Sequence, residues 1–461
     1  MNNKEYSKLL IICLVGASLF VASCKKYLDK SPDMQLTTPE VAQDLRAILD
    51  YNDLMNGYYP VYGAIASDDY YMTDDVYNAL SSTACQGYYI WGLNGEPTDW
   101  TQDWFLNYKR IFYVNVVLDN IDRVSLNGAT KEYLDAIKGE ALFYRGYTHF
   151  LQSQIYSLPY NPATASSTPG VPLRLTSDVN TESTRPDLQT EFKSIINDLK
   201  TAVPLLPENG SGKLRPTRPA AYAALANVYL VMQQYEDAGK MADAALSLDD
   251  SLLDYNSIEA HLQVPIPLFN REVIWQADLA YNEIFPTSKS KVPDSFFAMY
   301  QANDLRKQIF FDTTGDQIVF KGYYNGQYAG TSIYFAGLAV DELYLVKAES
   351  AARMGDLVGS SNALNKLAAS RFDKSDFTPF SFSEQKSAIA AVMDMRRKEL
   401  CFRGLWRWID IRRLSQIPGE EITLQRTLLG KTYILKPGDL HFAFLMPQDV
   451  IDNSKMEQNK R

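Results

Sequence analysis

Apolar side chains recur at spacings of three and four residues over much of the chain, which is the period of an amphipathic α-helix. Three long stretches in the first half show it, with apolar positions at Trp104, Tyr108, Ile111, Phe112 and Leu118; at Ile137, Ala141, Tyr144, Leu151 and Ile155; and at Leu188, Phe192, Ile195, Leu199 and Val203. We expect a helix over each stretch. The third has a capping pattern at its start, with Thr184 as the N-cap and Asp187 three residues on.

The segment 222–245 has the pattern of a helical repeat. Tyr222, Leu225 and Tyr229 share one helix face, and small residues at Ala238 and Ala242 let a second helix approach closely. A weaker copy spans 344–367. One such unit cannot bury its own apolar face, so several are expected to stack. We therefore predict an all-α, tetratricopeptide-like scaffold, with two unrelated alanine-rich hairpins as the alternative.

Two stretches lack this periodicity. Residues 51–103 and 250–335 are rich in Tyr, Phe, Asn, Gly and Asp. We expect loops and a few short strands there, inserted on the helical scaffold. Binding sites concentrate in loops that a rigid scaffold positions.

The N-terminus has the pattern of a lipoprotein signal. Leu9 to Ala22 form an uncharged run of fourteen residues after two lysines, too short to span a bilayer with ease. Small residues then precede Cys24, as they do where lipoprotein signals are cleaved. We expect residues 1–23 to be removed and Cys24 to be acylated, since multiple acyl chains anchor firmly. An ordinary secreted protein or an uncut signal anchor is the alternative.

Composition favours one large globular unit after this signal. The chain is 46% hydrophobic and 22% charged, which is typical of a full core. We predict a polar tether over 24–40 and a single domain over 41–461, with an N-terminal part to about 250 and a C-terminal part from about 251.

The charge disfavours nucleic acid as a partner. Residues 1–23 hold two lysines and one glutamate, so the rest carries 43 basic and 54 acidic side chains, a net charge of −11. Nucleic-acid binding requires a basic surface.

Of the four cysteines, only Cys85 and Cys401 lie beyond the expected anchor, and we interpret both as unpaired buried thiols.

Catalytic motifs are missing. The three histidines, His149, His261 and His441, have no metal-ligand spacing, and we expect no metal and no cofactor. His149 lies in an aromatic-rich helix and is interpreted as structural.

The acidic pairs Asp68-Asp69 and Asp74-Asp75 leave glycosidase activity open as an alternative, since such enzymes use two facing carboxyl groups. Acids in a Tyr-rich loop more often bind hydroxyl groups or face water, so we predict no enzymatic activity.

Aromatic residues are concentrated in one region. Residues 51–113 hold eleven Tyr, three Trp and two Phe, about twice the chain average of 12%. Trp91 and Trp100 flank a loop that contains Asn94, where an indole ring can cover a sugar ring while amides and acids bind its hydroxyl groups. A second cluster, Tyr323, Tyr324 and Tyr328, lies between glycine residues. We predict ligand-binding roles for Asp69, Trp91, Asn94, Trp100, Tyr323 and Tyr324, with packing of the loop onto the scaffold as the alternative for each.

Several motifs together resemble one family. They are Cys24-Lys25-Lys26-Tyr27-Leu28-Asp29, Glu140-Ala141-Leu142-Phe143-Tyr144-Arg145, Glu342-Leu343-Tyr344-Leu345 and Arg396-Arg397-Lys398-Glu399-Leu400 followed by Arg407-Trp408-Ile409-Asp410. The sequence resembles the SusD/RagB nutrient-uptake lipoproteins over its whole mature length. Trp406 and Trp408 beside the arginines suggest that the 396–413 block locks helices together through ion pairs and stacking.

The resemblance implies a cell-surface protein of the Gram-negative outer membrane. It implies a helical fold of tetratricopeptide-like units that caps a SusC-like TonB-dependent transporter barrel and binds oligosaccharides. Capture of peptides or other nutrients by the same lid mechanism is an alternative, and so is a pure protein scaffold.

Overall fold

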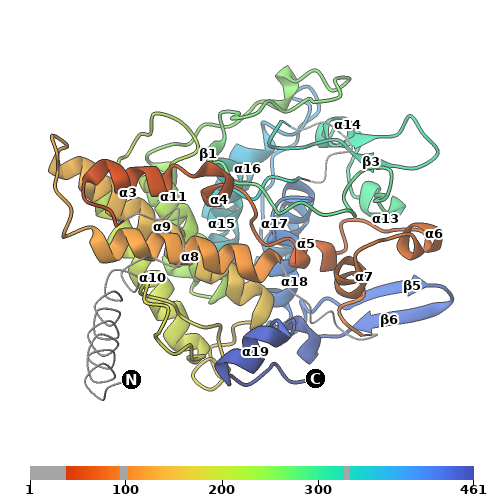
Figure 1. Ribbon diagram of the computed structural model, residues 1–461. Helices are drawn as coiled ribbons and strands as arrows, with labels where there is room; N and C mark the ends of the chain where they lie inside the picture. Colours follow the sequence, from red (N-terminus) through yellow and green to blue (C-terminus); the bar gives the residue numbers. More distant parts are fainter. Residues whose placement is uncertain (1–37, 94–101, 327–332) are drawn as a thin grey trace, which may run out of the picture.

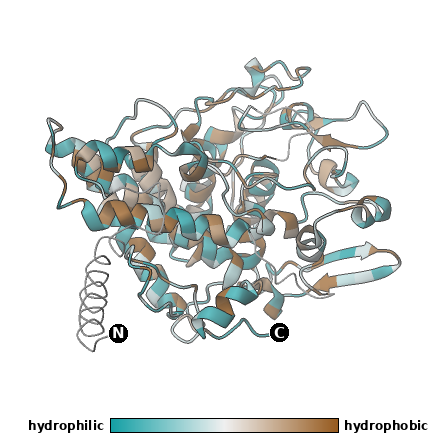
Figure 2. Cartoon of the chain, viewed as in Figure 1, coloured by the Kyte–Doolittle hydropathy of each residue, from teal (hydrophilic) through white to brown (hydrophobic). Residues whose placement is uncertain are grey.

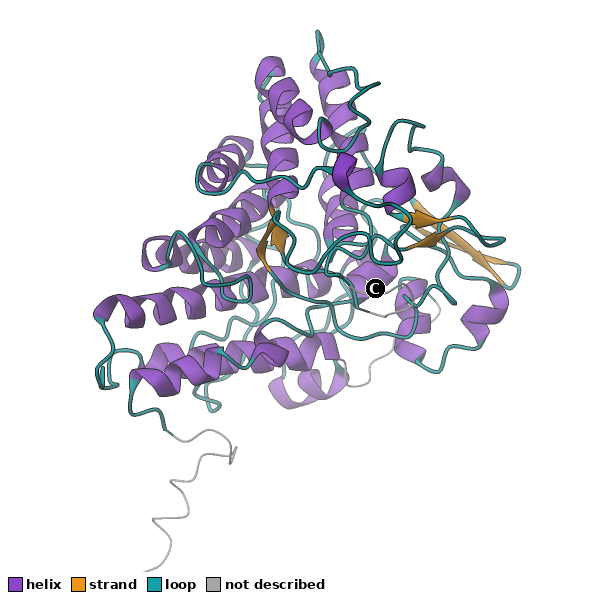
Figure 3. Ribbon diagram, turned by 90° about the horizontal axis from the view of Figure 1, so that it is seen from above, coloured by secondary structure: helices purple, strands orange, loops and turns teal. Residues whose placement is uncertain are grey.

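The computed structural model describes residues 38–93, 102–326 and 333–461. Within these ranges the chain is mainly helical, and its few strands form three small two-stranded sheets (Figure 1). Seen from above, the long helices form an array on one side, while short helices, strands and loops fill the other (Figure 3). The predicted fold class, a helical scaffold with irregular insertions, is confirmed.

Ten of the described helices precede the first strand in chain order. In the N-terminal half they are α3 (Ala42–Leu49), α4 (Asn52–Met55), α5 (Tyr62–Ala66), α6 (Asp74–Asn78), α7 (Thr83–Tyr89), α8 (Gln102–Asn120), α9 (Lys131–Tyr156), α10 (Leu188–Leu205), α11 (Arg218–Val231) and α12 (Tyr235–Leu246). In the C-terminal half they are α13 (Asp294–Phe297), α14 (Arg306–Ile309), α15 (Val340–Arg353), α16 (Leu357–Ala368), α17 (Gln385–Glu399), α18 (Trp406–Leu414) and α19 (Gln448–Ser454), with 3₁₀ turns at Tyr255–Ser257 and Leu440–Phe442.

The three long periodic stretches form α8, α9 and α10, as predicted. Hydrophilic and hydrophobic residues alternate along α8 in Figure 2. The start of α10 differs from the prediction: the N-cap is Asp187, whose carboxylate accepts the Thr190 N–H at 2.9 Å. Thr184 lies outside the helix, because Pro186 between the two residues disfavours helical backbone before it.

The repeat units are two similar helix pairs. Three residues join α11 to α12, with Gln233 at φ 60°, and three join α15 to α16, with Gly355 at φ 83°. The pairs lie side by side through α12 and α15, where a Cβ on Gly239 would lie 3.2 Å from Ser350 Cβ. Small residues therefore allow the close approach that the spacing predicted.

The irregular stretches differ from each other. Residues 250–335 hold β1 (Val273–Trp275), β2 (Phe311–Asp312) and β3 (Val319–Phe320), as expected, and β1 pairs antiparallel with β4 (Leu338–Ala339). The described part of 51–103 forms the short helices α4 to α7 instead of strands. A hairpin of β5 (Leu424–Leu428) and β6 (Lys431–Leu435) lies near the C-terminus.

The core joins distant parts of the chain. The fully buried ring of Trp275 packs against Tyr59, Phe143 and Tyr147, with centroids 5.4, 5.1 and 5.7 Å away. Trp408 Nε1 donates to the Gln154 carbonyl at 3.0 Å. Helix α9 is thus covered by both β1 and α18.

The 396–413 block is structural, as predicted. Arg396 pairs with Asp410 at 2.8 Å, and Arg413 pairs with Glu349 of α15 at 2.6 Å. All four side chains are buried. Removing one partner of such a pair leaves an uncompensated charge and costs about 3–5 kcal/mol.

The thiols and His149 are also interior groups. Cys85 and Cys401 are buried and free, which confirms their interpretation. Burial and the nearby Arg145 charge lower the pKa of His149 to about 3, and its ring contacts the Arg145 carbonyl and accepts the Arg174 N–H. No helix in the described ranges is both long and apolar enough to cross a bilayer.

Candidate functional site

Trp91 was expected on an exposed loop, and the structure buries it. Its ring is 1% exposed, and Nε1 donates to the Ala66 carbonyl at 2.9 Å. The guanidinium of Arg426, from β5, lies 5.0 Å from the ring centroid. Trp91 therefore presents no free face to a ligand in this structure.

Asp69 is likewise an interior residue. It is 4% exposed, pairs with Arg397 and accepts the Phe402 N–H at 2.9 Å. Its neighbour Asp68 accepts from Arg407 at 2.7 Å. The acidic pair ties the segment after α5 to α17 and α18.

Tyr323 and Tyr324 pack within the core. They are 1% and 2% exposed. The Tyr324 hydroxyl donates to Glu272, and the Arg403 guanidinium lies 3.9 Å from its ring centroid. Tyr323 stacks obliquely on Tyr334 at 5.2 Å. These contacts explain both rings without a ligand.

All four predicted site residues that the structure describes, Asp69, Trp91, Tyr323 and Tyr324, are therefore buried, which corrects the expectation that Trp91 is exposed on a loop. Much of the local aromatic enrichment serves core packing. Asn94, Trp100 and the expected anchor Cys24 lie outside the described residues, and their roles stay predictions.

A different surface hollow combines aromatic and polar side chains. It has a volume of about 360 Å³, and its lining includes Asn52, Asn56, Tyr58, Gln276, Asp278 and Tyr281. We call it the Tyr58–Tyr281 hollow. Tyr58 is 39% exposed and Tyr281 is 63% exposed.

Backbone pairing positions these side chains. The Tyr59 N–H donates to the Asp278 carbonyl at 3.1 Å, and the Ala280 N–H returns to the Tyr59 carbonyl at 2.8 Å. The Leu279 N–H donates to the Tyr334 carbonyl at 2.9 Å. Three segments far apart in sequence therefore lie side by side beneath the hollow.

Tyr58 has an unusual backbone conformation. Its φ is 57°, in the left-handed region that an aromatic residue rarely adopts. Such a conformation costs on the order of 1–3 kcal/mol and persists where the surroundings enforce it. Here the pairing of Tyr59 with the 278–280 segment holds the ring of Tyr58 outward.

Amide and carboxyl side chains form a hydrogen-bonded floor beneath the hollow. Asn56 Nδ2 donates to the Leu214 and Gln276 carbonyls at 2.8 and 2.7 Å, and Gln276 Nε2 donates to Asp278 at 3.1 Å. The side-chain oxygens of Asn56 and Gln276 accept no hydrogen bond from any described residue, but both atoms are buried, so the partly exposed Asp278 carboxyl is the acceptor nearest to solvent. Burial raises the pKa of Asp278, although Asn325 and Gln276 donate to it.

This set of groups suits a polyhydroxylated ligand. Exposed tyrosine rings cover the C–H face of a sugar, and amide and carboxyl oxygens accept from hydroxyl groups. Within the described residues there is no group of three His, Cys, Asp or Glu side chains placed to hold a metal ion.

Sequence reasoning missed this hollow for a physical reason. Asn56-Gly57 is a turn signal next to Tyr58, and it lies in the aromatic-rich stretch. The other wall comes from residues 276–281, more than two hundred positions later, and only the tertiary fold brings the two together.

Comparison with known families gives a match in the N-terminal half of the chain. Residues 26–230 match the SusD-like family described as starch-binding and associating with the outer membrane. No curated protein matches the sequence.

Solved structures share the fold over nearly the whole chain. A putative sugar-binding protein from Bacteroides vulgatus ATCC 8482 is 20% identical, with a TM-score of 0.75, over 92% of this chain and 99% of that chain. A SusD superfamily protein from Bacteroides thetaiotaomicron VPI-5482 is 18% identical, with a TM-score of 0.74, over 91% and 100%. A SusD-like carbohydrate-binding protein from B. vulgatus is 20% identical, with a TM-score of 0.68, over 90% and 97%.

Proposed function

We propose that the chain is a SusD-like protein that captures glycans at the cell surface and delivers them to a TonB-dependent transporter in the outer membrane. In this proposal the protein is a non-catalytic receptor. The family description and the sugar-binding relatives support the ligand class.

The observation that carries the proposal is the Tyr58–Tyr281 hollow. Two exposed tyrosines lie over amide and carboxyl groups in a space of about 360 Å³. That volume lies within the range of small-ligand sites and suits one or two sugar rings. A longer glycan would extend beyond it over neighbouring surface.

The anchor and the partner belong to the same proposal. Acylation at Cys24 would hold the protein on the membrane through lipid, since its acidic surface does not favour adhesion to anionic lipid. The transporter barrel would take the glycan as the receptor closes over it.

Calorimetry with the soluble chain, lacking residues 1–24, tests the ligand site. We expect binding to at least one neutral oligosaccharide of a panel that also contains peptides. The double variant Tyr58→Ala/Tyr281→Ala should lose roughly tenfold or more in affinity, because a stacking contact is worth about 1–3 kcal/mol. Tyr71→Ala, which removes a tyrosine that is 38% exposed outside the hollow, is the matched control.

Equal affinities of the double variant and wild type would place the ligand elsewhere, and selective peptide binding would overturn the glycan assignment.

A second experiment tests the partner: the tagged full-length protein is isolated in mild detergent from its outer membrane. A stoichiometric β-barrel protein should accompany the wild type, and Cys24→Ala should leave the membrane fraction.

A further inference from the structure

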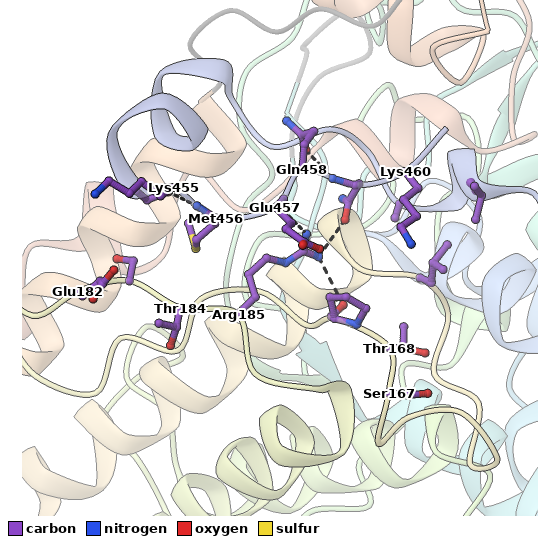
Figure 4. A pocket seen from close by; sticks show the side chains of 17 residues that line it. Ser167, Thr168, Glu182, Thr184, Arg185, Lys455, Met456, Glu457, Gln458 and Lys460 are labelled. Carbon is purple, nitrogen blue, oxygen red and sulfur yellow. Dashed lines mark hydrogen bonds between the residues drawn. The ribbon is translucent and has the colours of Figure 1, made fainter.

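A second and larger hollow lies between two segments that the first site does not use. It has a volume of about 620 Å³ and is formed by the 158–185 segment and the C-terminal stretch 440–460 (Figure 4). We call it the Arg185 hollow. It shares no lining residue with the Tyr58–Tyr281 hollow.

Arg185 fixes the walls of this hollow. Its Nε donates to the Gly170 carbonyl at 2.7 Å, Nη1 donates to the Glu457 carbonyl at 2.9 Å and Nη2 donates to Asn459 Oδ1 at 2.8 Å. Asn459 in turn donates to the Tyr156 carbonyl at 2.8 Å. The C-terminal stretch is thus held against the loop and against the end of α9.

The charge of Arg185 has no direct anionic partner. Every oxygen to which it donates is a neutral carbonyl or amide. Within the described part of the chain, no carboxylate forms an ion pair with Arg185, Lys455 or Lys460, although the chain as a whole has a net charge of −10. Burial lowers the pKa of Arg185, as expected for a buried cation without an anionic partner in direct contact.

Three basic and two acidic side chains line the hollow. Glu457 is exposed and Glu182 is exposed, so water screens both carboxylates. In Figure 4, Lys460 extends from the C-terminal stretch toward Thr168, and Arg185 extends from the facing 158–185 segment. The buried carboxyl of Glu191 lies near Arg185, and burial raises its pKa to about 8, so it is mainly uncharged at neutral pH.

An aromatic strip adjoins the hollow. Trp104, Tyr108 and Phe112 follow one another at four-residue spacing on one face of α8 and line a recess of about 190 Å³. The recess shares Ser183 and Met456 with the Arg185 hollow. Tyr108 and Phe112 are half-buried, and the Tyr108 hydroxyl donates to the Pro172 carbonyl at 2.9 Å.

We propose that the two adjoining hollows form a second glycan site, specific for an acidic oligosaccharide. A sugar carboxylate or sulfate lies against Arg185 and Lys460, and a neighbouring sugar ring packs on Tyr108 and Phe112. The ammonium of Lys460 donates charge-assisted hydrogen bonds to the oxyanion, and Arg185 contributes mainly its positive charge, because its N–H groups already donate to four protein oxygens. The apolar strip favours a sugar over a free anion. The site extends beyond the proposed function, since it uses different residues and a different ligand charge.

The experiment measures binding of a galacturonic acid tetramer and a chondroitin sulfate tetramer to the soluble chain by calorimetry. At least one should bind, and its affinity should fall as salt is raised. Lys460→Gln and Phe112→Ala should each lower that affinity, together by roughly tenfold or more. Lys386→Gln removes an exposed lysine outside the hollow and should change nothing.

Arg185→Lys retains the positive charge but loses the guanidinium hydrogen bonds that hold the walls of the hollow. Arg185→Gln loses both the charge and these hydrogen bonds. If Arg185→Gln fails to fold, Lys460→Gln still decides, because the Lys460 side chain is exposed. Binding of neither acidic tetramer, or equal binding by wild type and the paired variants, overturns the proposal. Inorganic sulfate alone that binds as tightly as the tetramers also overturns it, since the aromatic strip would then contribute nothing.

Failure of the first site is distinguishable from failure of this one. Tyr58→Ala/Tyr281→Ala should retain full affinity for the acidic tetramer. Lys460→Gln/Phe112→Ala should retain full affinity for a neutral glycan. If Tyr58→Ala/Tyr281→Ala lost its affinity for the acidic tetramer, both ligands would use a single site. That result would overturn the proposal of a second site.

Discussion

Asp103 is a buried acid at the start of α8 that couples stability to pH. Its carboxylate accepts the Val61 and Tyr62 N–H groups, both at 2.8 Å, yet its side chain is fully buried. Burial outweighs these hydrogen bonds and raises its pKa from 3.8 to about 7. Between these two values the native state binds a proton that the unfolded chain has released, so stability falls as pH rises.

Asp103→Asn should remove this part of the pH dependence. The amide oxygen can accept both N–H groups, and the variant has no charge to bury. We expect the urea midpoint of the wild type to fall more between pH 5 and pH 7.5 than that of the variant. Parallel curves over this range would contradict the assignment to Asp103.

Gly337 lies where no side chain fits. A Cβ there would be 2.0 Å from the Trp275 carbonyl oxygen and 2.9 Å from the Ala277 nitrogen, both backbone atoms beside the β1–β4 pair. Gly337→Ala should lower the free energy of unfolding by roughly 1–3 kcal/mol. Gly212→Ala meets no atom within 4 Å and should stay within about 0.5 kcal/mol of wild type, as measured by denaturant unfolding. Equal midpoints for the two variants would contradict the packing argument.

At the scale of elements, Asp69 connects the segment after α5 to α17. It pairs with Arg397 and accepts the Phe402 N–H in the interior. Asp69→Ala should cost up to about 3–5 kcal/mol, because the buried Arg397 would keep only its longer ion pair with Asp68, at 3.6 Å. Asp75→Ala, at an exposed acid, is the control and should change little. A variant of Asp69 that unfolds like wild type but loses ligand would restore the binding role first expected for it.

The helices were predictable from sequence because their signal is local. The spacing of Leu188, Phe192 and Ile195 predicts α10. The small residues Ala238 and Ala242 predict that α12 packs closely against α11. The short strands have no such local signal. Strand β1 is only three residues long, and all three residues are buried, so no alternation of apolar and polar positions marks it. Its pairing with β4 depends on residues more than sixty positions away.

The candidate site was less predictable than the helices. Trp91 and Tyr58 look alike in sequence, each an aromatic residue next to a glycine. Their different exposure arises from Arg426 in β5, which covers Trp91, and from the 278–280 segment, which turns Tyr58 outward. Neither partner can be assigned without the tertiary fold.

At the scale of the whole molecule, the two predicted parts share one core. Phe444 N–H donates to the Ile155 carbonyl at 2.9 Å, and Trp275 and Trp408 both pack on α9. A fragment of residues 38–250 would expose this face of α9. We expect the fragment to lack cooperative unfolding in calorimetry, while the soluble full chain unfolds in one transition. A fragment that unfolds cooperatively near the same temperature would indicate two independent domains.

The two buried thiols have a practical consequence. Cys85 and Cys401 are 5% and 1% exposed, and they are the only cysteines after residue 24. A thiol-reactive fluorophore would therefore react slowly with the native soluble chain. A cysteine introduced at Asn52, an exposed lining residue that leaves both tyrosines in place, would be readily labelled. The dye there would report the arrival of a sugar at the first hollow as a change in emission, in real time.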